Sequence, residues 1–174
     1  MDTSKRETAW QRAIAVATRK HDKQLRKDGK TPYASHPMRV AFTIRHVFDN
    51  TDETALVAAL LHDTIEDTTT DYDELVDEFG PDVAQVVAAV SKDGRLPHDQ
   101  REAAYDRQLC AATWQARLVK LADVYDNFCD SRSDAERAKA ADKARRAIQC
   151  AGDDPHLAAA VQIVRKLIER QSPE

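Results

Sequence analysis

The stretch AALLHDTIEDT (58–68) carries an apolar run directly into ionisable side chains. His62 and Asp63 end the run, and Glu66 and Asp67 follow one turn later. If the helix continues through them, i,i+4 spacing places His62 beside Glu66 and Asp63 beside Asp67. Three carboxylates so close would repel one another unless a cation lay nearby. The spacing therefore indicates a metal site, although a His-Asp pair by itself is more typical of a capped helix end.

Two further side chains could complete this site. His36 precedes Pro37, which disfavours helical geometry at His36 and places it at the N-terminus of a helix. In VKLADVYDN, Asp123 and Asn127 share the stripe beside the apolar one, so an aspartate enters the interior side of a core helix. A lone buried aspartate is costly unless it is paired or metal-bound. By ligand type alone, imidazoles and carboxylates together suit Mn²⁺, Fe²⁺, Co²⁺ or Zn²⁺ without choosing among them.

The elements that must position these residues are all predicted to be helices. Asp28-Gly29 and Pro32 break the chain into a loop after the first helix, which carries Trp10 on its apolar side. No stretch of strict alternation favours a sheet. The expected fold class is therefore all-α, with one domain over residues 1–174. The patterns predict helices over 7–20, from Pro37 to about 47, 53–63, a short one before Gly80, 81–90, 99–110, 113–128, 133–149 and 155–170.

Composition limits the class of protein. A chain of 174 residues with 42% hydrophobic and 32% charged residues is typical of a globular domain in water. The longest apolar run, ALVAALL (55–61), is far shorter than the roughly 20 residues that span a bilayer, so no membrane association is expected. The net charge of −4 argues against binding to long nucleic acids.

The cysteines indicate the compartment. Cys110, Cys129 and Cys150 are odd in number and have no C-x-x-C spacing. Neither a disulfide framework nor a thiolate zinc site is therefore expected, and a reducing cytoplasm is favoured. The N-terminus shows no apolar segment typical of a secretory signal. Nothing in the sequence indicates the oligomeric state.

Against the acidic net charge, RKHDKQLRKDGK (19–30) concentrates six basic residues. Taken alone, this segment is most typical of a solvated helix end and its loop. A small anionic ligand is the alternative, because clustered arginine and lysine side chains bind phosphates.

Four segments together resemble a known family: HDKQLRKDGKTPYASHP, AALLHDTIEDT, FGPDVAQVVAAVSKD and LVKLADVYDN. They are similar to the HD-superfamily metallohydrolases, and in particular to the hydrolase domain of the RelA/SpoT alarmone enzymes. The small stand-alone alarmone hydrolases, typified by the metazoan SpoT homologue, are most similar. The resemblance covers about residues 8–130 and implies an HD-domain bundle of about eight to ten helices.

The resemblance implies roles for particular residues. Four match the ligands of one divalent metal, which is Mn²⁺ in this family: His36, His62, Asp63 and Asp123. Two match the pair that orients or deprotonates the attacking water: Glu66 and Asp67. Three match positions that contact the nucleotide or line its pocket: Arg26, Lys27 and Asn127.

The implied reaction is removal of the 3′-pyrophosphate from guanosine tetra- or pentaphosphate, giving GDP or GTP, without synthesis of the alarmone. The partner would be a small phosphorylated nucleotide. One alternative is a related phosphohydrolase that acts on another nucleotide, such as removal of the 2′-phosphate of NADPH. A second is a non-catalytic nucleotide sensor, which would not need Glu66 and Asp67.

Some residues depart from the family pattern. Val124 stands where relatives carry arginine or lysine, and Asp126 stands where they carry tyrosine or histidine. Asp126 is expected to place a negative charge beside Asn127. A less positive pocket would favour a less highly phosphorylated nucleotide. Beyond residue 130 the resemblance fades, and Arg137 is expected to lie on a solvated helix face.

Overall fold

The computed structural model describes residues 8–170, with the side chains of residues 98 and 99 left aside. Within this range the chain forms helices and no β-strand, and an isolated bridge joins Leu25 and Pro32. The all-α prediction is therefore confirmed. The helices are α1 (Ala9–Lys20), α2 (Ser35–Phe42) continued by a π-helical turn (Thr43–Val47), α3 (Glu53–Leu61), α4 (Thr64–Asp67), α5 (Tyr72–Phe79), α6 (Pro81–Val90), α7 (His98–Cys110), α8 (Trp114–Cys129), α9 (Asp134–Ala151) and α10 (Ala158–Glu169).

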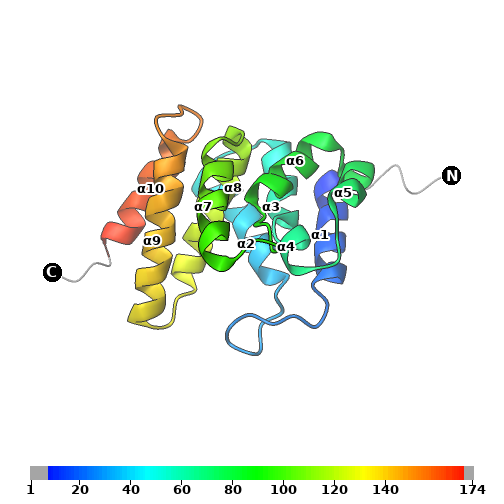
Figure 1. Cartoon of the computed structure of the whole chain (residues 1–174), viewed down its shortest axis with the longest axis horizontal. Coiled ribbons are helices and arrows are strands. Elements are labelled where there is room, and N and C mark those ends of the chain that lie inside the picture. Colours follow the sequence, from blue (N-terminus) through cyan, green and yellow to red (C-terminus); the bar gives the residue numbers. More distant parts are fainter. Residues whose placement is uncertain (1–7, 171–174) are drawn as a thin grey trace.

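The bundle is built around α3 and α8. Figure 1 shows α1 at one end of the molecule and α10 at the other, with α3, α6 and α8 between them. Helix α8 packs against α2, α3, α6, α9 and α10, so it meets both halves. The predicted domain boundaries of 1–174 include residues 1–7 and 171–174, which lie outside the described part.

Helix α3 delivers the His-Asp pair to the centre of the bundle. Its sequence is apolar on every side, and a helix of that kind is stable only when it is buried. Asp52 begins it by accepting the N–H of Ala55 at 2.8 Å. The α-helix ends at Leu61. A turn over residues 62–63 then separates α3 from the single turn of α4.

The basic loop after α1 has a defined structure. Asp28 accepts the backbone N–H groups of Lys30 and Thr31 at 2.9 and 2.8 Å. Gly29 follows Asp28 and has a φ of 67°, a conformation in which a side chain would be strained. The N–H of Tyr33 donates to the carbonyl oxygen of Gln24 at 2.8 Å. These bonds place the loop beside the N-terminal end of α2.

Two expectations about individual side chains were wrong. Trp10 is 47% exposed rather than in the core, because α1 lies at the edge of the bundle and turns this position outward. Cys110 and Cys150 form a disulfide between α7 and α9, although a sequence separation of 40 residues gave no sign of it. Their helices lie side by side only in the folded bundle. Disulfides are uncommon in reducing compartments, so the cytoplasmic location stays a prediction.

No helix in the described part of the chain is long and apolar enough to cross a membrane.

Candidate metal and active site

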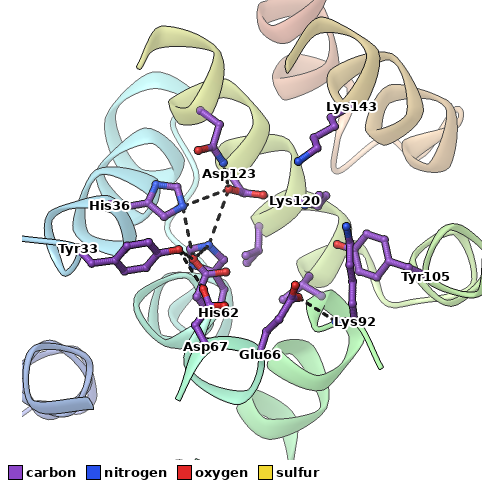
Figure 2. A pocket seen from close by; sticks show the side chains of 14 residues that line it. Tyr33, His36, His62, Glu66, Asp67, Lys92, Tyr105, Lys120, Asp123 and Lys143 are labelled. Carbon is purple, nitrogen blue, oxygen red and sulfur yellow. Dashed lines mark hydrogen bonds and ion pairs between the residues drawn. The ribbon is translucent and has the colours of Figure 1, made fainter. Parts of the chain in front are cut away.

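Three of the four expected metal ligands converge at one point. One ligand atom from each of His36, His62 and Asp123 lies within 4.8 Å of the other two, and all three residues are buried. The Nε2 of His36 lies 3.2 Å from Asp123 Oδ1, and the Nε2 of His62 lies 3.9 Å from the same oxygen. Asp63 is adjacent, with its Oδ2 3.1 Å from His62 Nε2 and 3.6 Å from His36 Nε2. Figure 2 shows His36, His62 and Asp123 directed toward one another from separate parts of the bundle.

The ring of His62 is oriented as a metal ligand would be. Its Nδ1 donates to the carbonyl oxygen of Ala59 at 2.8 Å, which leaves a lone pair on Nε2 in the neutral ring. That Nε2 is buried and makes no hydrogen bond within residues 8–170. Burial disfavours a proton there, but the negative charge of Asp63 outweighs burial and raises the pKa of His62 to about 9. A divalent cation fits this environment, because it would satisfy the nitrogen and the carboxylates together.

His36 is held from behind by a second carboxylate. Its Nδ1 donates to Asp126 Oδ2 at 2.7 Å, so its Nε2 is also left as an acceptor. Asp126 in turn accepts two bonds from Arg39, at 2.7 and 2.9 Å. The expectation that Asp126 makes the pocket less positive was therefore wrong. Its charge is buried between His36 and Arg39, because its position on α8 faces α2.

The other two carboxylates are also held by hydrogen bonds. Asp123 accepts bonds from Lys120 at 2.8 Å and from Asn127 at 2.5 Å. Burial would raise the pKa of Asp123, but the positive charge of Lys120 outweighs it, so that pKa lies well below its usual value. Asp63 accepts the hydroxyl of Tyr33 at 2.6 Å. Both carboxylates therefore stay ionised and available to a cation.

Tyr33 is a further site residue, although none of the roles assigned above includes it. Its ring lies on His21, with the ring centres 4.8 Å apart, while its hydroxyl reaches Asp63 and, at 3.3 Å, Asp67. A tyrosine three residues before a histidine is not a spacing typical of any metal or active site. Only the loop conformation, which turns Tyr33 toward the end of α3, brings it into the site.

Glu66 and Asp67 lie on α4 at the edge of the same cavity. Glu66 Oε2 accepts the backbone N–H of Lys92 at 3.0 Å, which fixes the direction of the carboxylate. Burial and the negative charge of Asp63 raise the pKa of Asp67 above its usual value. A raised pKa makes Asp67 a better proton acceptor near neutral pH.

Two cavities meet at the cluster of ligands. The smaller has a volume of about 180 Å³ and is lined by the expected ligands, by Glu66 and Asp67, and by lysines. The larger has a volume of about 500 Å³, which is within the range of small-molecule sites. Its wall includes Leu25, Val124 and Ala140, so it is less polar. Tyr33 and Asp123 line both cavities.

The residues expected to contact substrate line the larger cavity. Two of them are held by hydrogen bonds, and the third is exposed. Arg26 is buried and makes two bonds to Asp130, at 3.2 and 2.8 Å, which attach the basic loop to α8. Its Nη2 also donates to Asn127 at 3.2 Å, and Asn127 donates to Asp123. Lys27 is exposed at the cavity wall.

Several cationic side chains in the cavity walls were missed. Lys92 follows α6, and Lys139 and Lys143 project from α9, beyond the reach of the family resemblance. Arg137, the basic residue considered on that helix, ion-pairs with Asp134 at 3.4 Å and lines neither cavity. The only available signal was the i,i+4 spacing of Lys139 and Lys143, which is also common on solvated helix faces.

Comparison with known proteins adds to this geometry. The sequence profile described as HD domain matches residues 13–151. The chain is 43% identical over 119 residues to guanosine-3′,5′-bis(diphosphate) 3′-pyrophosphohydrolase MESH1 of Xenopus tropicalis, which covers 68% of this chain and 66% of that protein. It is 41% identical over 120 residues to a protein of the same enzyme name from Aquifex aeolicus, covering 67% of this chain and 17% of the other. The chain thus spans just under two thirds of the length of MESH1.

Solved structures agree with the fold. A metazoan orthologue of SpoT, described as hydrolysing ppGpp, superposes with a TM-score of 0.83 at 26% identity, covering 95% of this chain and 97% of the other. The protein lmo0812 of Listeria monocytogenes superposes with a TM-score of 0.63 at 24% identity, which supports the fold alone.

Proposed function

The chain belongs to the HD domain family, and from that premise we propose that it hydrolyses the 3′-pyrophosphate of guanosine tetra- and pentaphosphate. The observation that carries the proposal is the buried Nε2 of His62, which has no hydrogen-bond partner in the described chain and lies among carboxylates. The Glu66–Asp67 pair beside it supports catalysis rather than sensing. The enzyme names of MESH1 and its bacterial relative support the substrate.

The family implies a divalent metal, and the donor set here fits one. We propose that it is held by His36, His62, Asp63 and Asp123. Mn²⁺ is the proposed ion, while Fe²⁺, Co²⁺ and Zn²⁺ also suit two imidazoles and two carboxylates. When bound, the ion would lower the pKa of a water molecule and polarise a phosphoryl oxygen.

The protein's own carboxylates would complete the reaction. Asp67, with its raised pKa, takes the proton of the attacking water, and Glu66 orients that water from its bond to the Lys92 amide. The water oxygen bonds to the phosphorus attached to the 3′-oxygen, and the bond between that phosphorus and the 3′-oxygen breaks. The 3′-oxygen then takes up a proton, and pyrophosphate leaves.

The larger cavity would hold the nucleoside. Its volume suits a nucleotide and its wall includes apolar side chains. Lys27 is free to contact a phosphate, and Asn127 lies between the cavity and the ligand Asp123. Arg26, whose guanidinium is bonded to Asp130, supports Asn127 and would contact the nucleotide from the cavity wall.

Steady-state hydrolysis with Mn²⁺ tests this function, with guanosine tetraphosphate and NADPH supplied in parallel. We expect GDP and pyrophosphate from the first substrate. Asp63→Ala should lose both metal and activity, whereas Glu66→Ala should keep the metal and lose turnover. Normal turnover by Glu66→Ala would overturn the proposed role of Glu66. Incubation with GTP and ATP should yield no alarmone.

Each outcome with NADPH is informative. Orthophosphate and NADH as the only products would move the substrate to NADPH and keep the mechanism. Binding of guanosine tetraphosphate without turnover of any nucleotide would instead favour a sensor.

A further inference from the structure

Helix α9 contributes a cation to the cavity that holds the proposed metal ligands. Figure 2 shows Lys143 extending from this helix toward Lys120 and the centre of the cavity. Lys143 lines both the smaller and the larger cavity. It makes no hydrogen bond or ion pair with any residue that the structure describes. The two neighbouring lysines differ, because Lys92 pairs with Glu102 and Lys120 pairs with Asp123.

Tyr105 supplies an unsatisfied polar group to the same wall. It is only 5% exposed, and its hydroxyl makes no hydrogen bond of good geometry within the described residues, although the Lys120 side chain is close to it. The ammonium groups of Lys92 and Lys120 each lie 5.3 Å from the centre of its ring. Figure 2 shows the hydroxyl directed into the cavity. A buried hydroxyl without a well-placed partner destabilises the folded state, and a ligand oxygen that accepts its hydrogen bond would remove that cost.

The cations of this wall are crowded. Burial, followed by the positive charges of Lys120 and Lys92, lowers the pKa of Lys143. An anion between these groups would relieve the repulsion and accept their hydrogen bonds. In Figure 2, His36, His62 and Asp67 lie on the other side of the cavity, with Asp123 and Glu66 between them and the lysines. The small cavity therefore has the proposed metal ligands at one end and Lys143 and Lys92 at the other.

We propose that Lys143, Lys92 and the Tyr105 hydroxyl form a subsite for the outer phosphate of a diphosphate group. Hydrolysis releases this whole diphosphate group as pyrophosphate. This inference rests on the proposed function and adds a specificity to it. The nucleoside requires the larger cavity, and the attacked phosphorus lies at the ligands between the two cavities. The phosphate beyond that phosphorus must then extend into the smaller cavity, toward Lys143. A substrate with a single phosphate at the reacting position does not reach this subsite.

Direct binding tests the subsite without relying on turnover. The Mn²⁺-loaded full-length protein is titrated calorimetrically with inorganic pyrophosphate and, separately, with orthophosphate. Metal content is measured before and after, so that removal of the ion by pyrophosphate is recognised. We expect Lys143→Gln to weaken pyrophosphate binding about tenfold or more, because an ammonium–phosphate bond is lost. Tyr105→Phe should weaken it severalfold, and orthophosphate binding should change less than twofold.

The matched control is Arg145→Gln, which removes the same charge from α9. Two residues along a helix correspond to about 200° of rotation, so Arg145 faces away from the cavity. It ion-pairs with the exposed Asp142 at 2.6 Å. Pyrophosphate binding should be unchanged in this variant. An equal loss of pyrophosphate affinity in both variants would mean that only the net charge of the protein matters, and it would overturn the subsite.

The outcomes separate the two proposals. Unchanged pyrophosphate binding in Lys143→Gln would overturn the subsite, even if guanosine tetraphosphate is hydrolysed normally by the wild type. Lys143-dependent pyrophosphate binding by a protein that hydrolyses no guanosine tetraphosphate would retain the subsite and remove the proposed substrate. If NADPH proves to be a second substrate, Lys143→Gln should lower kcat/KM for guanosine tetraphosphate about tenfold and leave that for NADPH unchanged.

Discussion

At the scale of single residues, the orientation of each histidine depends on a partner outside the cavity. His62 is held by a backbone carbonyl, and His36 is held by Asp126, which Arg39 holds in turn. In the neutral form of each ring the outer nitrogen carries the proton, which leaves the inner nitrogen with a lone pair for a cation. Such partners fix the orientation of a ligating histidine ring and make its other nitrogen a stronger ligand. Asp126, a departure from the family pattern, thus supports His36 at the proposed metal site.

Asp126→Asn tests this support. The change removes the negative charge beside His36 Nδ1 and weakens the pair with Arg39. We expect metal affinity to fall about 10- to 100-fold, the usual effect of losing such a partner. Calorimetric titration with Mn²⁺ measures it. Asp82→Asn is the control, because it removes the same charge from an exposed position in the first turn of α6 that lines neither cavity. Equal affinity in wild type and Asp126→Asn would show that His36 needs no such partner.

At the scale of elements, α9 connects the C-terminal part of the chain to the site. The Cys110–Cys150 disulfide attaches its C-terminal end to α7, the helix that carries Tyr105. Arg117 of α8 adds bonds to the carbonyl oxygens of Cys150 and Ala151, both at 3.3 Å. Helix α9 forms part of the cavity wall through Lys139, Ala140 and Lys143, whereas α10 lines neither cavity.

Loss of the disulfide should lower the stability of the folded protein. Cys150→Ala opens a loop of 40 residues, and we expect the free energy of unfolding to fall by about 2–4 kcal/mol. Chemical denaturation of the oxidised protein measures this difference. Cys129→Ser is the control, because Cys129 is free and exposed. A reductant should destabilise the wild type as well and leave Cys150→Ala unaffected. Equal stability of wild type and Cys150→Ala would contradict the disulfide.

The junction of α5 and α6 depends on a glycine. Gly80 ends α5 and begins α6 with φ 86° and ψ 163°, a conformation that only glycine adopts readily. A methyl group there would meet no neighbouring atom within 4 Å, so only the backbone opposes it. We expect Gly80→Ala to cost about 1–3 kcal/mol of unfolding free energy. Gly94→Ala is the matched control, because Gly94 has an ordinary φ and open space around it. Similar stability of the two variants would contradict the strain.

At the scale of the whole molecule, the proposed metal would join parts of the bundle that are distant in sequence. His36 lies on α2, His62 and Asp63 follow α3, and Asp123 lies in the middle of α8. These elements already pack against one another through the core. Without the ion, two carboxylates and two imidazoles remain together in a buried space. Binding of a cation should therefore stabilise the folded chain as a whole.

Thermal unfolding with and without metal tests this coupling. Mn²⁺ at 100 times its Kd should add about 2.7 kcal/mol, and for a chain of this size that raises Tm by roughly 5–10 °C. A chelator should reverse the shift. Asp63→Ala should show little response to the ion, and the matched Asp71→Ala variant, which changes a cap of α5, should respond as the wild type does. The absence of a shift in the wild type would mean that the ligands do not hold Mn²⁺ in the folded state.

The sequence by itself determined the all-α fold, the approximate extent of most helices and the family. These depend on local periodicity, on caps and breaks, and on motifs that keep their spacing whatever lies around them. It also located His36, His62, Asp63 and Asp123, because the chemistry of a metal site requires those residue types. Their roles, and those of Glu66 and Asp67, stay predictions until the experiments above are made.

Only the tertiary structure decided which distant side chains face each other. It turned Asp126 toward His36 instead of the cavity, brought Tyr33 to Asp63, and joined Cys110 to Cys150. It also placed Lys143 in the wall of the site, although the resemblance had faded before that helix. The physical reason is that a residue's environment is set by the packing of helices. Packing depends on contacts between segments far apart in the chain, and spacing along one segment does not encode them.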